Sequence, residues 1–74
     1  MLNRVVEAMD RQGLLRDISE VLSREKINVT AANTITKNLH SRMAFTIEVP
    51  SLDALKRALG YVRDVKGVLN ATRR

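Results

Sequence analysis

The sequence predicts a mixed α+β fold, with four strands in one antiparallel sheet and two helices covering one of its faces. Three observations lead to this prediction. Apolar residues recur at helical spacing in two separate segments. Four other segments are short and rich in β-branched or apolar residues, and one of them alternates strictly between apolar and other side chains. The order of these segments is strand, helix, strand, strand, helix, strand.

The first strand and the first helix occupy the N-terminal third of the chain. Residues 2–9, LNRVVEAM, are valine-rich and end at a polar turn, which is typical of a strand. From Gly13 the pattern changes to that of an amphipathic helix. This helix should end near Lys26, whose charge suits a helix C-terminus. Its apolar face is expected to carry Leu14, Leu15, Ile18, Val21 and Leu22.

A hairpin is predicted next. Residues 27–36, INVTAANTIT, are β-branched and mostly uncharged, which indicates a second strand. Residues 37–41, KNLHS, indicate a turn in which Asn38 takes a left-handed conformation. The third strand follows, and its core-facing side chains are expected to be those of Met43, Phe45, Ile47 and Val49.

The last third of the chain contains the second helix and the fourth strand. Pro50 ends the third strand, and Ser51 is a good N-cap for the helix that follows. Residues 64–67 form a turn, and residues 68–73 form the final strand. The apolar stripe of this helix is expected to carry Leu52, Leu55, Ala58, Leu59 and Val62.

These elements combine into one arrangement. Each strand–helix–strand crossover is right-handed, and both helices must bury their stripes, so both lie on one face of the sheet in a ferredoxin-like fold. Residues 1–74 are expected to form a single domain, because two domains would each be too small to bury a core. Glu7 and Glu48 are both expected on the open face, where they could be neighbours, and two solvated strand residues are the simpler interpretation. Arg4 falls on the core side, near a strand end where its head group reaches water.

The composition excludes several classes of function. The chain has no cysteine and one histidine, His40, which is too little imidazole and thiolate for a metal site, so His40 is expected in a surface turn. No catalytic constellation is present, so neither enzymatic activity nor a cofactor is expected. No apolar run approaches the roughly 20 residues that cross a bilayer. With no signal-peptide layout at the N-terminus either, a cytoplasmic location is expected.

The net charge of +5 favours polyanions, but the basic residues are scattered. An RNA-binding sheet of this topology stacks bases on aromatic residues of its central strands. Here Phe45 is expected on the core face and Tyr61 on a helix, so that stacking platform is absent. RNA contact would then be electrostatic, and a solvated basic surface is the simpler interpretation. The basic residues available for such contact are Arg11, Lys37, Arg42, Lys66, Arg73 and Arg74.

The stretch DRQGLL, residues 10–15, is the candidate binding site. Gly13 permits a sharp turn, and the backbone N–H groups of the first helical turn form a seat for an anion such as a carboxylate. Asp10 could cap this turn or hold an ammonium group, and the amide of Asn28 could bind a small zwitterion. A strand-to-helix turn without any ligand has the same pattern, and the residues alone favour that interpretation.

The same residues carry a resemblance to a known family. VVEAMDRQGLLRDISEVLSREKINV resembles the first half of an ACT domain, a small ligand-binding regulatory module. The segments VEAMDRQGLLRDIS, FTIEVPSLDALKRAL and VKGVLNATR resemble the C-terminal ACT domain of RelA/SpoT-type enzymes, the (p)ppGpp synthetases and hydrolases of the stringent response. The positions that match the family hallmark are Asp10, Arg11, Gly13, Leu14, Leu15, Ile18, Ile27, Asn28 and Val29.

The resemblance implies a noncatalytic domain that couples binding of a small ligand, often an amino acid, or of a partner to the activity of a parent GTP pyrophosphokinase. ACT domains commonly pair as homodimers, by strand edges or helices, and bind ligands at the interface beside the glycine turn. Gln12 stands where many ACT domains have proline, which makes this turn less rigid. By position, the site would be lined by Asp10, Arg11, Gly13, Leu14 and Asn28.

The resemblance also implies contact with the ribosome through the parent protein. The alternative function is therefore a basic docking module that contacts ribosomal RNA or a protein without a small ligand. Steep salt dependence of binding would favour this alternative, and a saturable effect at the glycine turn would favour the regulatory function.

Overall fold

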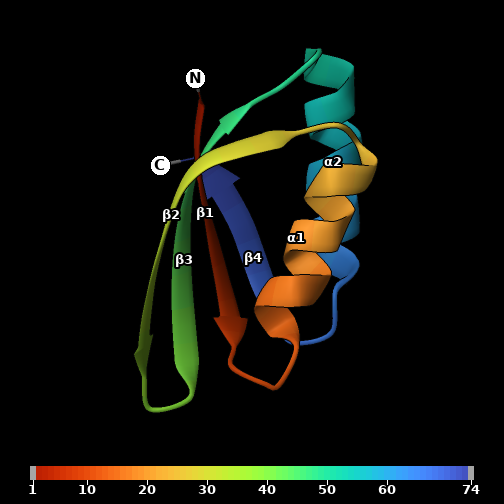
Figure 1. The fold of residues 1–74 in the computed structure, drawn as a ribbon. Coiled ribbons are helices and arrows are strands. Elements are labelled where there is room, and N and C mark those ends of the chain that lie inside the picture. Colours follow the sequence, from red (N-terminus) through yellow and green to blue (C-terminus); the bar gives the residue numbers. More distant parts are fainter. Residues whose placement is uncertain (1, 74) are drawn as a thin grey trace.

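The computed structural model describes residues 2–73 and has the predicted order of elements. The strands form one antiparallel sheet in the order β2-β3-β1-β4. Figure 1 shows α1 and α2 side by side on one face of this sheet, which confirms the ferredoxin-like arrangement. The elements are β1 (Leu2–Met9), α1 (Leu14–Arg24), β2 (Asn28–Lys37), β3 (His40–Glu48), α2 (Leu52–Asp64) and β4 (Val68–Arg73).

The hairpin between β2 and β3 is tighter than predicted. Lys37 pairs with His40, so only Asn38 and Leu39 form the turn, with φ angles of 52° and 65°. Two consecutive residues with positive φ are typical of the type I′ turn, whose twist matches that of the flanking strands. The left-handed conformation of Asn38 is confirmed. His40 belongs to β3, and β3 begins three residues earlier than the first residue of the predicted alternation, Met43.

The core lies between the helices and the alternate strand residues that face them. Met43, Phe45 and Ile47 are buried in β3 as predicted, because the side-chain period of a strand is two. The helices contribute the predicted stripes with two exceptions, Leu15 and Leu52, which are 47% and 67% exposed. Leu15 lies at the margin of its stripe, beside the buried Leu14. Leu52 begins α2, whose first turn extends past the strands in Figure 1.

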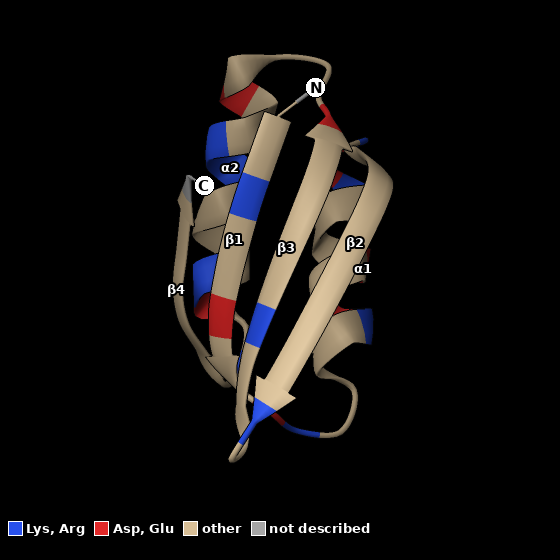
Figure 2. Cartoon of the chain, turned by 90° about the vertical axis from the view of Figure 1, so that its left-hand side faces the viewer, with Lys and Arg blue, Asp and Glu red and all other residues tan. Residues whose placement is uncertain are grey.

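Two expectations about charged strand residues are wrong. Arg4 alternates with Val6 and Ala8 on the helix-covered face, and it is only 9% exposed, with β1 lying in the interior of the sheet between β3 and β4. Glu7 is opposite Arg42, whereas Glu48 is opposite Asn28, six residues further along β3. The two carboxylates are therefore about 20 Å apart along the sheet. Figure 2 marks the charged residues along the strands, and the sheet contains few of them.

β2 is an edge strand, and all ten of its residues are exposed. The hairpin of β2 and β3 extends past the ends of both helices in Figure 1. A bulge interrupts the register between Val29 and Ala31, and the hydroxyl of Thr30 donates to the carbonyl of Thr46 at 3.2 Å. Beyond the bulge the strand pairs regularly as far as Lys37 and carries no charge before that residue. An uncharged open edge of this length is a surface on which another strand can pair.

Candidate functional site

Gly13 forms the turn between β1 and α1. Its backbone is left-handed, with φ 81° and ψ 1°, and it occupies the N-cap position of α1. A Cβ atom at this position would lie 3.3 Å from Nη2 of Arg16. Glycine adopts this backbone conformation without the strain that other residues incur. The predicted turn at the start of the helix is therefore confirmed.

Asp10 holds this turn through its backbone. Its amide N–H donates to the carbonyl of Leu39 at 2.7 Å, which ties the turn to the tip of the β2–β3 hairpin. No side chain caps α1, so the predicted cap by the Asp10 side chain is wrong. The left-handed Gly13, which has no side chain, occupies the N-cap position, and the Asp10 side chain is exposed.

The anion seat is narrower than predicted. The N–H of Leu14 donates to the carbonyl of Arg11 at 3.3 Å, and the Leu14 side chain is 1% exposed in the core. Leu14 therefore anchors the turn, and neither its side chain nor its amide is directed to a ligand. The N–H of Leu15, in the first turn of α1, has no intrahelical acceptor. With the Leu14 amide occupied, the N–H groups of Gly13 and Leu15 are what remains of the predicted anion seat.

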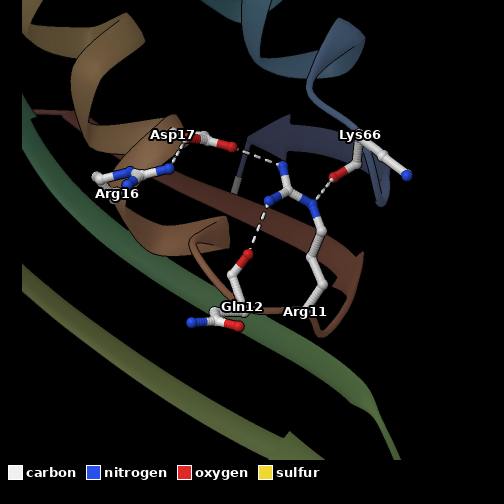
Figure 3. Close-up of polar contacts among 5 residues, drawn as sticks. All are labelled: Arg11, Gln12, Arg16, Asp17 and Lys66. Atoms are coloured by element: carbon white, nitrogen blue, oxygen red, sulfur yellow. Dashed lines mark hydrogen bonds and ion pairs between the residues drawn. The ribbon is translucent and has the colours of Figure 1, made fainter.

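Arg11 bonds to three different groups (Figure 3). Its Nε donates to the carbonyl of Lys66 at 2.7 Å, Nη1 to the carbonyl of Gln12 at 3.0 Å, and Nη2 to Oδ2 of Asp17 at 2.8 Å. The hydrogen bond and charge of Arg11, aided by Arg16, hold the pKa of the Asp17 carboxyl below its usual range. The resemblance placed Arg11 in a ligand site, but in this structure its guanidinium binds the protein itself.

Asn28 lies at the other end of the sheet. Its side chain donates to Oε1 of Glu48 at 3.0 Å, whereas β1 ends with Met9 opposite His40. The eleven residues of α1 span about 16 Å between the two ends. Within one chain the structure therefore brings together Asp10, Arg11, Gly13 and the backbone of Leu14, and it does not bring Asn28 to them.

The contacts of two residues next to this site were not predicted from the sequence. Asp17 follows Arg11 by six residues, a spacing that becomes a contact only when a turn reverses the chain. Lys66 contributes its backbone carbonyl, which no side-chain pattern reveals. Both face a shallow groove of about 310 Å³ between α1 and the α2–β4 turn, lined by Arg11, Asp17, Glu20, Val21, Arg24, Val65 and Lys66.

Two further features bear on the classes of function. Among residues 2–73, no group of three or more His, Asp or Glu side chains could hold a metal ion. His40 is an exposed residue 3.9 Å from the carboxylate of Glu7. Neither α1 nor α2 has the length and apolar character needed to span a membrane.

Residues 3–73 match the family described as ACT domain. The chain is 43% identical over 70 residues to the GTP pyrophosphokinase of Escherichia coli (strain K12), covering 92% of this chain and 9% of that protein. It is 36% identical over 69 residues to the bifunctional (p)ppGpp synthase/hydrolase RelA of Mycobacterium tuberculosis, covering 92% and 9%. It therefore spans about a tenth of the length of these relatives.

Solved structures share the fold. The ACT domain from the GTP pyrophosphokinase of Chlorobium tepidum superposes with a TM-score of 0.86 at 22% identity, covering 99% of this chain and 95% of that one. A homoserine dehydrogenase from Thiobacillus denitrificans superposes with a TM-score of 0.79 at 16% identity, covering 97% and 16%. With the family match over residues 3–73, the sheet order and the left-handed glycine before α1, the chain belongs to the ACT domain family.

Proposed function

We propose that this chain is a noncatalytic regulatory domain of a (p)ppGpp synthetase/hydrolase. Binding of a small ligand or a partner to the domain would shift the parent enzyme between activity states. The identity of 43% to a GTP pyrophosphokinase supports this parent, and a cytoplasmic location follows from that assignment. The observation that carries the ligand proposal is the left-handed Gly13 beside the exposed carboxylate of Asp10.

An amino acid is the ligand class that this turn fits. The N–H groups of Gly13 and Leu15 can donate to its carboxylate, and the helix dipole favours negative charge at that end of α1. The carboxylate of Asp10 can accept from its ammonium group. A zwitterion thus meets a partner of opposite sign at each end, whereas a plain anion would be repelled by Asp10.

Pairing of two copies would complete the site. If the open edges of two β2 strands pair antiparallel, Asn28 of the partner subunit comes to the Lys37 end of β2. That end of the sheet also carries the turn at Gly13, because the Asp10 amide bonds to the hairpin at Leu39. The separation of Asn28 from Gly13 within one chain is then no obstacle, since the two residues belong to different subunits of a homodimer.

Docking to ribosomal RNA is the alternative function. Lys37 and Arg42 are exposed on the open side of the hairpin, where they would meet phosphates. Phe45 is buried at 4% exposure and Tyr61 lies on α2, so base stacking on the sheet has no platform among the described residues. Contact of this kind would be electrostatic and would weaken steeply with salt.

An amide NMR titration with pooled amino acids tests the ligand. We expect saturable shifts at Gly13, Leu15 and Asn28, and we expect the Asp10→Asn variant to bind at least tenfold more weakly. Asp53→Asn is the control, because Asp53 is an exposed carboxylate at the start of α2. Absence of any saturable shift at millimolar amino acid, together with salt-dependent binding of a ribosomal RNA fragment, would favour the alternative.

Sedimentation equilibrium tests the pairing. The Ile35→Lys variant places a charge on the open edge of β2 and should raise the dimer dissociation constant at least tenfold. Leu52→Lys is the matched control, since Leu52 and Ile35 are similarly exposed, at 67% and 62%, but Leu52 lies on α2. A wild-type chain that stays monomeric at millimolar concentration would refute the homodimer.

A further inference from the structure

Two turns that are distant in the sequence meet at one end of the sheet. The first joins β1 to α1 and contains residues 10–13, and the second joins α2 to β4 and contains residues 65–67. The amide of Met9, at the end of β1, donates to the carbonyl of Gly67 at 2.7 Å. The two turns are therefore in contact through the backbone before any side chain is considered.

Arg11 is the side chain that joins these turns. Its guanidinium reaches across 55 positions of the sequence to the carbonyl of Lys66, while it also holds Gln12 and Asp17 on its own side (Figure 3). We call these three hydrogen bonds the Arg11 bridge. Each of the three guanidinium nitrogens has an acceptor, and the side chain is 26% exposed. A planar, charged fork suits such a role better than the single ammonium of lysine.

The neighbouring residues Asp10 and Arg11 form hydrogen bonds to opposite sides of the sheet. The Asp10 amide bonds to Leu39 in the β2–β3 hairpin, and Arg11 bonds to Lys66 beside β4. In the sheet order, β2 and β4 are the two edges. The turn at Gly13 is therefore tied to the β2–β3 hairpin on one side and to the turn before β4 on the other, so a shift of this turn must strain at least one of these two bonds.

We propose that Arg11 is a positioning residue that couples the turn at Gly13 to the Lys66–Gly67 turn, and that it does not contact the ligand. This inference rests on the proposed function, since it describes how binding at that turn reaches the rest of the domain. A ligand or a partner subunit at the Asp10 side shifts the turn, and the Arg11 bridge transmits that shift to Lys66 and to the start of β4. Without the Arg11 bridge, a ligand still binds at the turn, but β4 no longer responds to it.

The first experiment needs no ligand. Amide hydrogen exchange is measured by NMR in the wild-type chain, in Arg11→Gln and in Arg16→Gln. Arg16 is the matched control, because it contacts the same Asp17 carboxylate at 3.4 Å but is 79% exposed and reaches neither turn carbonyl. We expect Arg11→Gln to accelerate exchange of the Met9 amide at least tenfold and to shift the Gly67 and Val68 resonances. Equal behaviour of the two variants would overturn the proposal.

The second experiment uses Arg11→Lys. This variant keeps the positive charge, and it serves as the test if Arg11→Gln does not fold. The same pooled amino acids are titrated into both proteins. In the wild type, shifts at Gly13 should be accompanied by shifts at Gly67. In Arg11→Lys the affinity read at Gly13 should stay within threefold, and the shift at Gly67 should disappear.

The outcomes separate this inference from the proposed function. Loss of all amino acid binding in Arg11→Lys, with Met9 exchange unchanged, would make Arg11 a ligand contact and overturn the positioning role. A wild-type chain that binds no amino acid would refute the ligand part of the proposed function. The positioning role of Arg11 would then be tested by the hydrogen exchange experiment alone.

Discussion

Gly67 and Met9 approach so closely that no side chain fits between them. A Cβ atom on Gly67 would lie 2.9 Å from the backbone oxygen of Met9, and real Cβ atoms do not come this near to another heavy atom. The φ angle of Gly67 is 98°, which other residues rarely adopt. Both the conformation and the contact therefore require glycine at the entry to β4.

The Gly67→Ala variant should be destabilised by about 1–3 kcal/mol, because the backbone must move away from Met9 and still hold a strained φ. Gly60→Ala is the matched control. Gly60 lies within α2, and a Cβ there meets nothing within 4 Å. That variant should be stabilised by about 0.5–1 kcal/mol, the cost of glycine in a helix. Urea unfolding of both variants is the measurement, and similar changes in the two would contradict the prediction.

Ser51 should contribute measurably to α2. Its hydroxyl oxygen accepts from the amide of Ala54 at 3.0 Å, which satisfies one of the free N–H groups of the first turn. Ser51→Ala should lower the free energy of unfolding by about 1 kcal/mol. Ser19→Ala, at an exposed position within α1, should leave it unchanged or slightly higher, because alanine is the better helix former. Thermal unfolding of the two variants measures this difference. Equal losses of stability in Ser51→Ala and Ser19→Ala would argue against a stabilising cap at Ser51.

Most of the fold could be predicted from the sequence, because side-chain period alone separates the elements. The stripe through Ile18 and Leu22 and the alternation through Phe45 and Ile47 each predicted a face that is buried in the structure. Leu15 was misplaced because it lies at the margin of its stripe, beside the buried Leu14. Leu52 was misplaced because it begins α2, whose first turn extends past the strands.

The candidate site could be predicted only in part. The turn at Gly13 could be predicted because a glycine at the start of a helix is typical of a sharp backbone turn. The acceptor at Lys66 was not, since every residue offers a carbonyl and only the folded chain brings this one to Arg11. The separation of Asn28 from Gly13 follows from topology. Because α1 runs back along the sheet, it returns the chain toward the end opposite to where β1 stopped.

Leu39 has a strained backbone conformation, and its side chain is mostly exposed. It has φ 65° and is 68% exposed at the second position of the two-residue turn. Leu39→Gly creates the Asn-Gly pair that type I′ turns prefer, so it should raise the free energy of unfolding by up to about 1 kcal/mol. Leu39→Ala keeps the strain and removes the side chain, so it should not stabilise the chain. If glycine gave no gain over alanine in urea unfolding, the strain argument would be wrong.

Asp17 gives the Arg11 bridge a defined dependence on pH. The hydrogen bond from Arg11 lowers the pKa of this carboxyl in the folded chain relative to the unfolded chain. A group with a lowered folded pKa contributes stability above its unfolded pKa, about 3.9 for aspartate, and loses it as the pH falls through the folded pKa. Asp17→Asn resembles the protonated carboxyl and lacks this dependence.

The difference in stability between wild type and Asp17→Asn should therefore stay constant above about pH 5 and shrink as the pH is lowered from about 5 to about 2. Urea unfolding across that range measures it, and the Gly67 amide resonance of the wild type should move over the same interval as the bridge weakens. Because the Asp17 side chain is 32% exposed, added salt should reduce the difference near neutral pH. A difference that stays constant with pH would mean that the carboxylate charge does not sustain the bridge.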